Sequence, residues 1–465
     1  MLASIVNTFS NCFKIPELKS RISFTFVVLA ICRLAAWIRI PGLDGAKLTE
    51  YFATNTSSSG GVLGMYSLFT GGALEKCAIG ALGIMPYISA TIVMQLLTAV
   101  VPSLSKMVRE EGGRVKIIKY SRYLTVLLCI AQGLFMAISW EHPQGIFSGF
   151  VGTLVYPDQN IWWYRFQTVL ILTTGTLLLM WLGEQITERG IGNGISLVIT
   201  IGILARLPAA GQGLKDMFFP AVAGPQTYNF GHAIALLFLL AAVVAGTIAV
   251  TQAQRKIPVQ YAQRAVGRKM YSGGTSFLPL RLNFAGVMPI IFAGAILMVP
   301  QQLFFMIGKS YPDLRFFSGW ATALADGSPV HLIIYTLMIL FFSYFWTATQ
   351  FNELQIADDL KKNGGYIPGV RPGQATSNYL NNSMKRITLA GAIFLTIIAV
   401  IPIILIRQLH IPQTVGSFFG GTSMLILVGV LLDTMRQMES HLMMRHYDGF
   451  LKGGRGGGSR LRGRF

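Results

Sequence analysis

The side chains that most often perform chemistry in proteins are sparse in this sequence and form no catalytic pattern. The four cysteines, Cys12, Cys32, Cys77 and Cys129, lack the CxxC spacing of a thiolate metal site. The six histidines form no HExxH pattern, and there is no GxxxxGK[ST] loop for nucleotide phosphates. We therefore expect no disulfide, metal, cofactor or enzymatic activity, and any energy must come from outside this chain.

Ionisable residues are also nearly absent from the middle of the apolar stretches. A charge there costs about 2.5 to 3.5 kcal/mol on insertion scales and usually marks an ion path. The polar residues found at this depth are amides, Gln95, Asn193 and Asn283. This pattern argues against proton-driven or sodium-driven transport and predicts a path lined by aliphatic side chains. Three charged residues near the ends of apolar stretches keep the ion-driven alternative open: Glu184, Arg206 and Asp433.

The elements that position these residues are long apolar stretches, as expected of an integral membrane protein. Of the 465 residues, 52% are hydrophobic and 12% charged, and the mean hydropathy is +0.54. Stretches of about 17 to 25 apolar residues cross a bilayer as helices, whereas barrel strands would alternate in shorter segments. We predict an all-α membrane protein with ten spans, near residues 22–40, 77–101, 123–140, 166–183, 191–207, 232–251, 284–307, 331–349, 387–406 and 417–435.

The distribution of lysine and arginine predicts the topology. The net charge is +19, and most of the 38 basic residues fall in the amino-terminal segment, four alternate loops and the carboxyl tail. The positive-inside rule places these parts, and both termini, in the cytoplasm, where they attract anionic phospholipid. The arginine-glycine tail is low in complexity and expected to be disordered. It could contact phospholipid or RNA phosphate, or be a solvated basic tail.

A short apolar piece between two glycine pairs interrupts the sequence of ordinary spans. It runs from Val62 to Phe69, with the glycine pairs at 60–61 and 71–72. It is too short to cross a bilayer, so it is either a half-helix inside the protein or an ordinary external loop. A half-helix beside two sets of five spans, which have inverted topology, is also typical of repeat-built transporters.

Four motifs carry a resemblance to a known family. They read "ALGIMPYISATIVMQLL", "WLGEQITERGIGNGIS", "ADDLKKNGGYIPGVRPG" and "FGGTSMLILVGVLLD". In this order and on these elements they resemble the SecY family of protein-conducting channels, from about Pro16 to Tyr447. The resemblance implies two pseudo-symmetric five-helix halves around an hourglass pore with a lateral gate. The chain departs from the family pattern at two places. Family members often have a proline soon after the Phe-Asn pair, whereas this chain reads Phe351-Asn352-Glu353, and a second arginine is usual where Lys256 follows Arg255.

The resemblance also implies roles for individual residues in the membrane. A narrow aliphatic ring blocks ions by dewetting and offers no fixed charge to grip a passing chain. The half-helix, about 60–72, would be the plug that closes the pore, with Val62, Leu63, Met65, Leu68 and Phe69. Gln95 and Asn283 would lie on the lateral gate, paired across its seam. The implied pore ring is Ile84, Ile88, Ile199, Ile203, Ile291 and Ile426; its alternative is ordinary helix packing.

Outside the membrane the resemblance implies contacts with partners. Two Pro-Gly pairs stiffen the loop that carries Arg371, which lowers the entropy lost on docking. The arginine fork can bind carboxylate or phosphate, so the partner could be the SecA motor or a ribosome with its RNA. SecE-like and SecG-like membrane subunits, signal sequences and nascent chains are further implied partners. The basic residues of the 6/7 loop would add to the contact: Arg255, Lys256, Arg264, Arg268 and Lys269.

Together these expectations describe a channel in the bacterial cytoplasmic membrane. It would translocate unfolded secretory polypeptides and release transmembrane segments laterally, driven by a motor or ribosome. The alternative from another class is a small-solute secondary transporter. The expected organisation is 1–21 amino-terminal segment, 22–207 first half with the plug, 208–230 external loop, 231–435 second half with the cytoplasmic 6/7 loop (252–283) and 8/9 loop (350–386), and 436–465 basic cytoplasmic tail.

Overall fold

A computed structural model gives the architecture of the chain. It describes residues 15–54, 67, 69–110, 112–143, 150, 152–156, 160–219, 228–261, 264–266, 269–271, 275–310, 315–324, 328–409, 411, 415–416, 418 and 422–453. Helices dominate these residues, and the strands form two small sheets, one of three and one of two strands.

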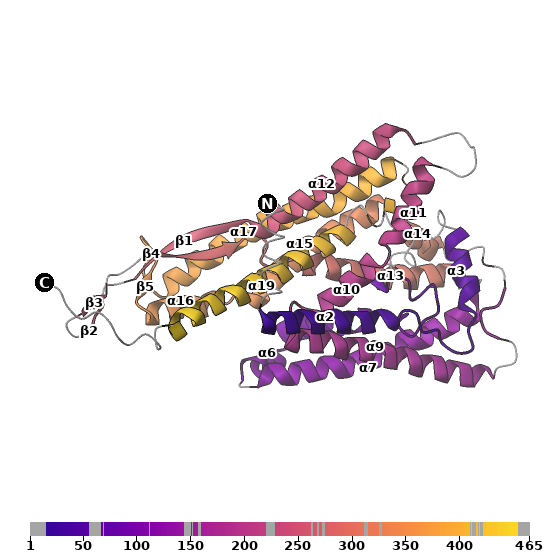
Figure 1. Ribbon diagram of the computed structural model, residues 1–465, viewed down its shortest axis with the longest axis horizontal. Coiled ribbons are helices and arrows are strands. Elements are labelled where there is room, and N and C mark those ends of the chain that lie inside the picture. The colour runs from indigo at the N-terminus through magenta and orange to yellow at the C-terminus, as the bar shows by residue number, and fades with distance from the viewer. Residues whose placement is uncertain are drawn as a thin grey trace.

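The first half of the chain is a set of packed helices, drawn from indigo to magenta; α2, α6, α7 and α9 lie in the lower part of Figure 1, and α11 lies at the upper right. Helix α9 is central, because α2, α7 and α10 all pack against it. The helices are α2 (Pro16–Leu34), α3 (Gly45–Thr54), α5 (Met85–Val100), α6 (Pro102–Arg109), α7 (Gly113–Glu141), α9 (Ile161–Arg189), α10 (Gly194–Leu204) and α11 (Leu207–Phe218).

The second half forms a matching set that lies above the first in Figure 1. The two halves meet where α10 packs on α19 and where α5 packs on α13. The second set contains α12 (Phe230–Gln252), α13 (Met288–Ser310), α14 (Arg315–Ala323), α15 (Pro329–Gln350), α16 (Glu353–Lys362), α17 (Gln374–Gln408) and α19 (Thr422–Gly453).

Every one of the ten predicted spans coincides with helix over most of its length. Six helical segments among the described residues are long and apolar enough to cross a bilayer, and α5 with α6 forms a pair bent by 104°. Of the other predicted spans, 284–307 contains the shorter apolar segment Met288–Leu297. Helix α2 carries charges near both ends: Glu17, Lys19, Arg21 and Arg33. The six segments are Val115–Glu141, Ile161–Arg189, Gly194–Phe218, Phe230–Gln252, Pro329–Lys362 and Gln374–Gln408.

The predicted second span, 77–101, is wrong at its beginning. Residues 77 and 79–84 are turns, Ala78 forms an isolated β-bridge with Arg39, and the helix starts only at Met85. Cys77 and Gly83 have positive φ values of 48° and 59°, which a helix does not allow. Gly80 lies so close to α2 that a methyl group there would come within 3.2 Å of the Ala35 carbonyl oxygen. Close backbone contact therefore replaces the first turns of the expected helix.

The two large loops of the second half are more regular than a loop prediction implies. The 6/7 loop contains β1 (Gln254–Tyr261), β2 (Arg264–Val266), β3 (Lys269–Tyr271) and β4 (Thr275–Arg281). Strand β1 pairs antiparallel with β4 on one side and with β5 (Gly365–Tyr366) of the 8/9 loop on the other. Helix α17 also begins thirteen residues before the predicted span at 387, directly after Gly373.

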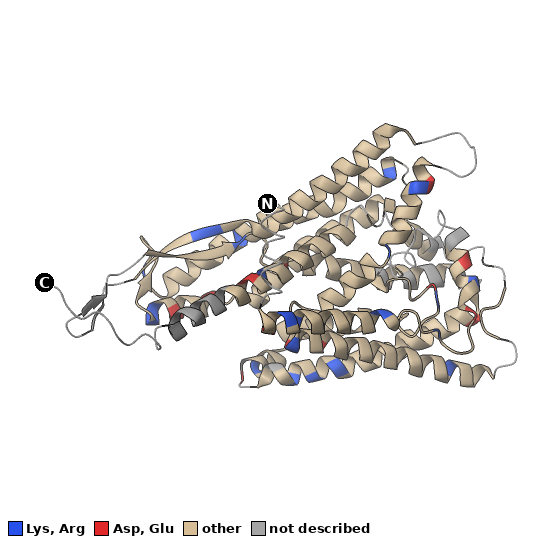
Figure 2. Ribbon diagram, viewed as in Figure 1, with Lys and Arg blue, Asp and Glu red and all other residues tan. Residues whose placement is uncertain are grey.

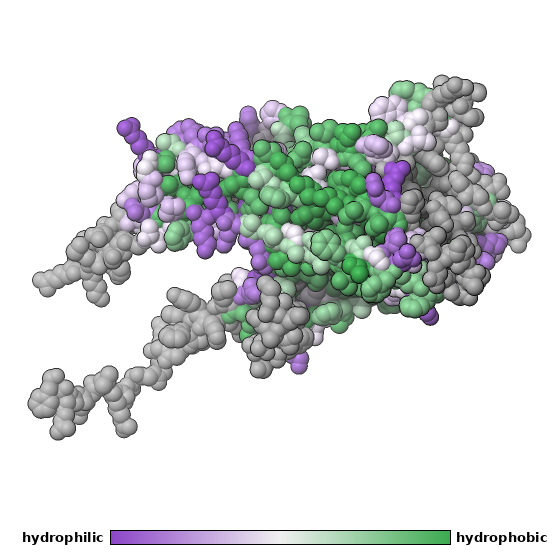
Figure 3. Space-filling view, turned by 90° about the horizontal axis from the view of Figure 1, so that it is seen from above, coloured by the Kyte–Doolittle hydropathy of each residue, from purple (hydrophilic) through white to green (hydrophobic). Residues whose placement is uncertain are grey.

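The chain leaves an apolar belt between two charged ends. Charged residues lie mostly toward the two ends of the helices in Figure 2, and the ribbon between them is almost free of charge. The face shown in Figure 3 has a hydrophobic middle, with hydrophilic residues at the β1–β4 end and at the opposite end. Side chains such as Leu237 and Phe238 are more than 70% exposed in this belt, as expected for a surface that faces lipid.

Candidate functional site

The six isoleucines of the expected ring come together in the centre of the molecule. None is more than 4% exposed, and all belong to one continuous hydrophobic cluster. They come from four helices, two in each half: Ile84 and Ile88 at α5, Ile199 and Ile203 in α10, Ile291 in α13 and Ile426 in α19. We call this set the isoleucine cluster, and it lies where the two halves meet.

The start of α10 is fixed by short contacts that the motif "GNGIS" supplies. The Asn193 side-chain oxygen accepts hydrogen bonds from the backbone N–H groups of Ile195 and Ser196, at 3.1 and 3.3 Å, and so caps the helix. A methyl group at Gly194 would come within 1.8 Å of the Gly183 carbonyl oxygen, so only glycine allows α10 to approach α9 here. These contacts set the register that brings Ile199 and Ile203 to the centre.

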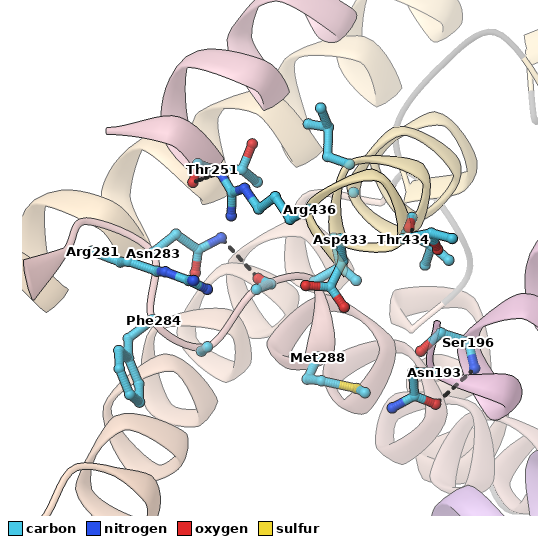
Figure 4. Close-up of a pocket in the computed structure, with 16 residues that line it drawn as sticks. Asn193, Ser196, Thr251, Arg281, Asn283, Phe284, Met288, Asp433, Thr434 and Arg436 are labelled. Atoms are coloured by element: carbon cyan, nitrogen blue, oxygen red, sulfur yellow. Dashed lines mark hydrogen bonds between the residues drawn. The ribbon is translucent and has the colours of Figure 1, made fainter. Parts of the chain in front are cut away.

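A polar cavity lies on one side of the isoleucine cluster (Figure 4). It has a volume of about 180 Å³ and is lined by the start of α10, the chain before α13, and α19. Its lining reaches Ser196, Met288 and Val430, which are three or four residues from Ile199, Ile291 and Ile426 respectively. Residues at this spacing lie one above the other on the same face of a helix. The lining of the cavity therefore lies about one helical turn from the isoleucine cluster.

The polar lining of the cavity is mixed in charge. Figure 4 shows Asp433 and Arg436 of α19 on the same cavity as Arg281, the last residue of β4, and Asn283, which follows the strand. Arg436 donates from Nη2 to the Thr251 carbonyl oxygen at 2.6 Å, which fixes its position at the end of α12. The cavity thus offers both signs of charge and two side-chain amides, Asn193 and Asn283, to a polar group.

A segment of the first half covers the other side of the isoleucine cluster. We call its described residues, Ser67 and Phe69–Glu75, the Gly71 segment. Gly71 has a φ of 63°, and a methyl group there would come within 2.9 Å of the Cα atom of Gly202 in α10. Gly202 is next to Ile203, and eight residues of helix from Gly194 span about 12 Å. The polar cavity and the Gly71 segment therefore lie at opposite ends of α10.

The expected plug residues are only partly covered by the structure. Phe69 is half-buried in the Gly71 segment and packs against the main hydrophobic cluster. Ser67 and Phe69 are helical, and turns begin at Thr70, which agrees with a helix that ends before the second glycine pair. The other four residues lie outside the described part of the chain: Val62, Leu63, Met65 and Leu68.

Charged groups tie the Gly71 segment to the neighbouring helices. The Arg206 guanidinium, at the end of α10, contacts the Glu75 carboxylate and the Ser67 hydroxyl. The Ser67 hydroxyl donates to Glu75 Oε1 at 2.7 Å, and Arg33 of α2 donates from Nη1 to the Gly71 carbonyl oxygen at 2.7 Å. The sequence alone identifies Arg206 only as a charge near the end of an apolar stretch, and no local pattern predicts its contacts with Glu75 and Ser67.

Lys76 directly follows the Gly71 segment in the chain. Its ammonium group lies 3.3 Å from the centroid of the Trp37 ring, a cation–π contact. Burial lowers the pKa of Lys76, and the cations Arg33 and Arg39 lower it further, while Glu75 opposes them. The cations around Glu75 are therefore close enough to influence one another.

The two amides expected on the lateral gate do not pair with each other. The Asn283 amide donates from Nδ2 to the Gly286 carbonyl oxygen at 2.8 Å, within its own turn. Gln95 Oε1 is buried and has no hydrogen-bond partner among the described residues. Asparagine often bonds to nearby backbone in turns, and this local partner prevails here. Helices α5 and α13 still pack together, so the seam itself exists without the expected pair.

The residues expected to contact partners gather on one projection. We call β1, β4, β5 and residues 367–373 the platform; it projects at the end opposite α11 and α14 in Figure 1. A separate hydrophobic cluster supports it, with Ile257 and Val259 of β1 packed among Ile367, Leu380 and other residues. Arg255 and Lys256 are exposed on β1. The platform is therefore rigid and presents its cations to solvent.

Arg371 lies at an exposed turn of the platform. Gly369 and Gly373, on either side, have positive φ values of 82° and 102°. The Val370 N–H donates to the Ile367 carbonyl oxygen at 3.0 Å, and the Thr376 hydroxyl donates to the Arg371 carbonyl oxygen at 2.9 Å. The backbone of this turn is thus held in place while the arginine side chain is exposed.

The rest of the expected basic contact is less fully described. Arg264 pairs with Tyr271, and Lys269 pairs with Val266, in the two-stranded sheet at the tip of the 6/7 loop. Arg268 lies outside the described residues. At Phe351-Asn352-Glu353, the Asn352 side chain accepts from the Gln355 N–H at 3.2 Å and caps α16.

The chain is similar to known proteins over most of its length. The sequence model of the SecY family matches residues 78–435. A curated relative from Chlamydia trachomatis, a protein translocase subunit SecY, is 42% identical over 453 residues, which cover 96% of this chain and 98% of the relative. The corresponding protein of Chlamydia muridarum is 40% identical and covers 97% of this chain and 100% of its own length.

Solved structures with the same fold are more distant in sequence. A protein-conducting channel matches with a TM-score of 0.59 and 19% identity, over 92% of this chain and 96% of its own. The Sec61 chain of a canine ribosome–channel complex from the endoplasmic reticulum matches with a TM-score of 0.55 and 18% identity, over 92% of this chain and 96% of its own. The architecture of two helical halves is shared with both.

Proposed function

The chain belongs to the SecY family and is a multi-pass membrane subunit of a protein translocation channel, and we propose that its polypeptide path runs between the six residues of the isoleucine cluster. The observation that carries this proposal is the order of features along α10. Ser196 faces the polar cavity, Ile199 and Ile203 lie in the cluster, and Gly202 lies under the Gly71 segment. A polar opening, an aliphatic constriction and a cover follow each other along one helix.

The chemistry of the constriction suits a passing chain of arbitrary sequence. All six side chains are branched hydrocarbons, and the cluster is assembled from both halves of the molecule. An aliphatic constriction excludes water and ions when it is closed. It makes no fixed hydrogen bond or ion pair that a polypeptide would have to match, so the halves can separate around any sequence. We propose that the Gly71 segment is part of the plug over this constriction.

The seam between α5 and α13 is the proposed route into lipid. It lies between the two halves, and no amide pair closes it, since Asn283 bonds within its own turn and Gln95 Oε1 is unpaired in the described part of the chain. The packing of α5 against α13 then opposes opening without help from this amide pair. We propose that an apolar signal sequence or a nascent transmembrane helix replaces this packing when it leaves sideways.

The platform is the proposed docking site for the partner that supplies energy. The exposed Arg371 turn, with Arg255 and Lys256 on the neighbouring strand, offers cations on a rigid support. Such a surface binds a carboxylate-bearing motor resembling SecA, or ribosomal RNA phosphate, with little loss of entropy. Arg264, Arg268 and Lys269 extend the same loop. Phosphate contacts of this kind weaken as the salt concentration rises.

The setting in the cell is part of the proposal. We place the chain in the bacterial cytoplasmic membrane with the platform and both termini in the cytoplasm, because the positive-inside rule assigns the segments rich in lysine and arginine to that side. SecE-like and SecG-like subunits would cover exposed apolar helix faces, and the chain would act without an enzymatic activity of its own. The polar cavity, at the platform end of α10, would then be the cytoplasmic mouth of the pore.

Site-specific crosslinking tests the proposed path. A photoreactive amino acid is placed at Ile88 or Ile203 in membranes where a secretory chain is stalled midway. Leu237 and Leu337, which are 71% and 59% exposed on the apolar belt, are the matched controls. We expect adducts at the two cluster positions alone, dependent on a signal sequence and lost when the chain is released. If translocation continues but no adduct forms at Ile88 or Ile203, the proposed path is wrong and these isoleucines serve only in helix packing.

A further inference from the structure

The contact between Arg206 and Glu75 suggests how the closed state is held. We propose that this ion pair is a latch that keeps the Gly71 segment over the isoleucine cluster, and that the latch must open before a polypeptide can pass. The inference rests on the proposed function, because it assumes that the path runs between the isoleucines. It adds two residues that set the threshold for opening.

The latch is built directly onto the constriction. Arg206 follows Ile203 by three residues, and its backbone N–H donates to the Ile203 carbonyl oxygen at 3.1 Å. Residues three apart in a helical turn share a face, so the guanidinium stands one turn beyond Ile203. A movement of α10 that widens the constriction therefore pulls on the latch.

The Gly71 segment is held by the latch and by backbone contact together. Glu75 and Ser67, at the two ends of the segment, both contact the Arg206 guanidinium. Between them, the close approach of Gly71 to Gly202 leaves no room for a side chain. Arg33 adds a third attachment through the Gly71 carbonyl oxygen. The segment cannot leave α10 without giving up the Arg206 contacts.

The partial exposure of the pair makes it a reversible latch. The Arg206 and Glu75 side chains are 20% and 23% exposed, so water can solvate both charges once they separate. Separating a fully buried ion pair would cost a large free energy, because both charges would then lie unpaired in an apolar medium. Arg206 Nε is buried without a hydrogen-bond partner among the described residues, so the guanidinium is not fully satisfied even in the closed state. Both features favour release when the halves separate.

Ion flux through resting channels tests the latch. The purified channel with its membrane subunits is reconstituted into vesicles, and potassium and chloride flux is measured without substrate for Glu75→Gln and for Arg206→Gln. We expect each variant to leak at least tenfold more than the unchanged protein. The exchange of charges, Glu75→Arg with Arg206→Glu, should bring the leak back to within about threefold, because it restores the attraction.

A second ion pair of the first half is the matched control. Glu141 at the end of α7 binds Arg165 of α9 through bidentate hydrogen bonds, the shortest at 2.8 Å, and does not contact the Gly71 segment. Glu141→Gln removes an ion pair of similar burial and should leave the leak unchanged. An equal leak in Glu141→Gln and Glu75→Gln would show general loosening and overturn the latch.

The outcomes for the latch and for the polypeptide path are distinguishable. A normal resting leak in both single variants overturns the latch, even if Ile203 still crosslinks to the stalled chain. The absence of crosslinks from Ile203 to a stalled chain overturns the polypeptide path, whatever the resting ion leak. Failure of the charge exchange to reduce the leak, in a protein with unchanged thermal unfolding, would also overturn the latch, because the attraction would then not be what holds the segment.

Discussion

The isoleucine cluster and the platform differ in burial, in polarity and in the halves of the molecule that build them. The cluster is buried, aliphatic and shared between both halves, and none of its six members is more than 4% exposed. The platform has its own hydrophobic support, lies within the second half, and exposes Arg371, Arg255 and Lys256. On the proposed account, the isoleucine cluster seals the closed channel until the two halves separate, and the platform offers exposed cations to a partner.

The comparison indicates that gating and docking are separable in this chain. Substitutions in the cluster should change the resting leak, because the two halves meet there. Substitutions on the platform should change the rate of translocation but leave the leak and the stability unchanged. The predictions below test this separation, beginning with the largest expected effect.

A charge in the isoleucine cluster should open the resting channel. Ile203→Asp places a carboxylate among aliphatic side chains, where a charge costs about 2.5 to 3.5 kcal/mol. We expect the closed state to lose stability and the ion leak of reconstituted channels to rise about a hundredfold. Ile203→Leu, which keeps the volume and polarity, is the control. A low leak for Ile203→Asp, in a protein that folds normally, would contradict an ion-excluding role for the cluster.

Loss of the platform arginine should slow translocation without a leak. Arg371 is exposed, so Arg371→Ala removes no packing, but it removes charged hydrogen bonds to a partner worth about 1.5 to 3 kcal/mol. We expect translocation into membrane vesicles to slow about tenfold or more, with unchanged thermal unfolding. Arg371→Lys should recover only part of the rate, since lysine lacks the planar fork. Lys361→Ala, another exposed cation of the same loop, is the control.

The two gate amides should behave as independent residues. Asn283→Ala removes one hydrogen bond within a turn and should lower the free energy of unfolding by about 1 kcal/mol. Because Gln95 does not bond to Asn283, the double substitution to alanine should equal the sum of the two single effects within about 0.5 kcal/mol. Chemical unfolding of the four proteins measures this. A larger coupling would reinstate the pair expected from the sequence.

A methyl group under the Gly71 segment should have the smallest effect. Gly202→Ala would place its Cβ 3.1 Å from the Phe69 carbonyl oxygen, so the segment must shift by a few tenths of an ångström. We expect a two- to fivefold rise in resting leak and no change in the rate of docking to the platform. Gly211→Ala in α11, where a methyl group would meet nothing within 4 Å, should have no effect on the leak. Equal leaks in the two variants would argue against a sealing contact at Gly202.

Much of the fold was predictable because apolar length determines which segments enter a bilayer. All ten predicted spans are helical over most of their length. The non-helical start of the second predicted span was not foreseen, since Cys77 and the turn after it are as apolar as a helix. Hydropathy measures how well a segment tolerates lipid and not its backbone conformation.

The site was predictable where it depends on a motif and unpredictable where it depends on distant contacts. The isoleucines, implied by resemblance, do gather in one cluster, although their role in the pore stays a prediction. The pairing of β1 with β5 joins loops a hundred residues apart, which no local pattern reveals. The Arg206–Glu75 contact likewise joins residues 131 positions apart. Asn283 shows the reverse, because a nearby carbonyl replaced the distant partner.

A structure of the channel complex with a secretory chain stalled midway would test the polypeptide path most directly. The measurement is the position of the chain relative to the isoleucine cluster, at a resolution that shows side chains. We predict continuous polypeptide between Ile88 and Ile203 on one side and Ile291 and Ile426 on the other, with Glu75 separated from Arg206. Polypeptide outside a closed isoleucine cluster, with the Gly71 segment still on Gly202, would contradict the path.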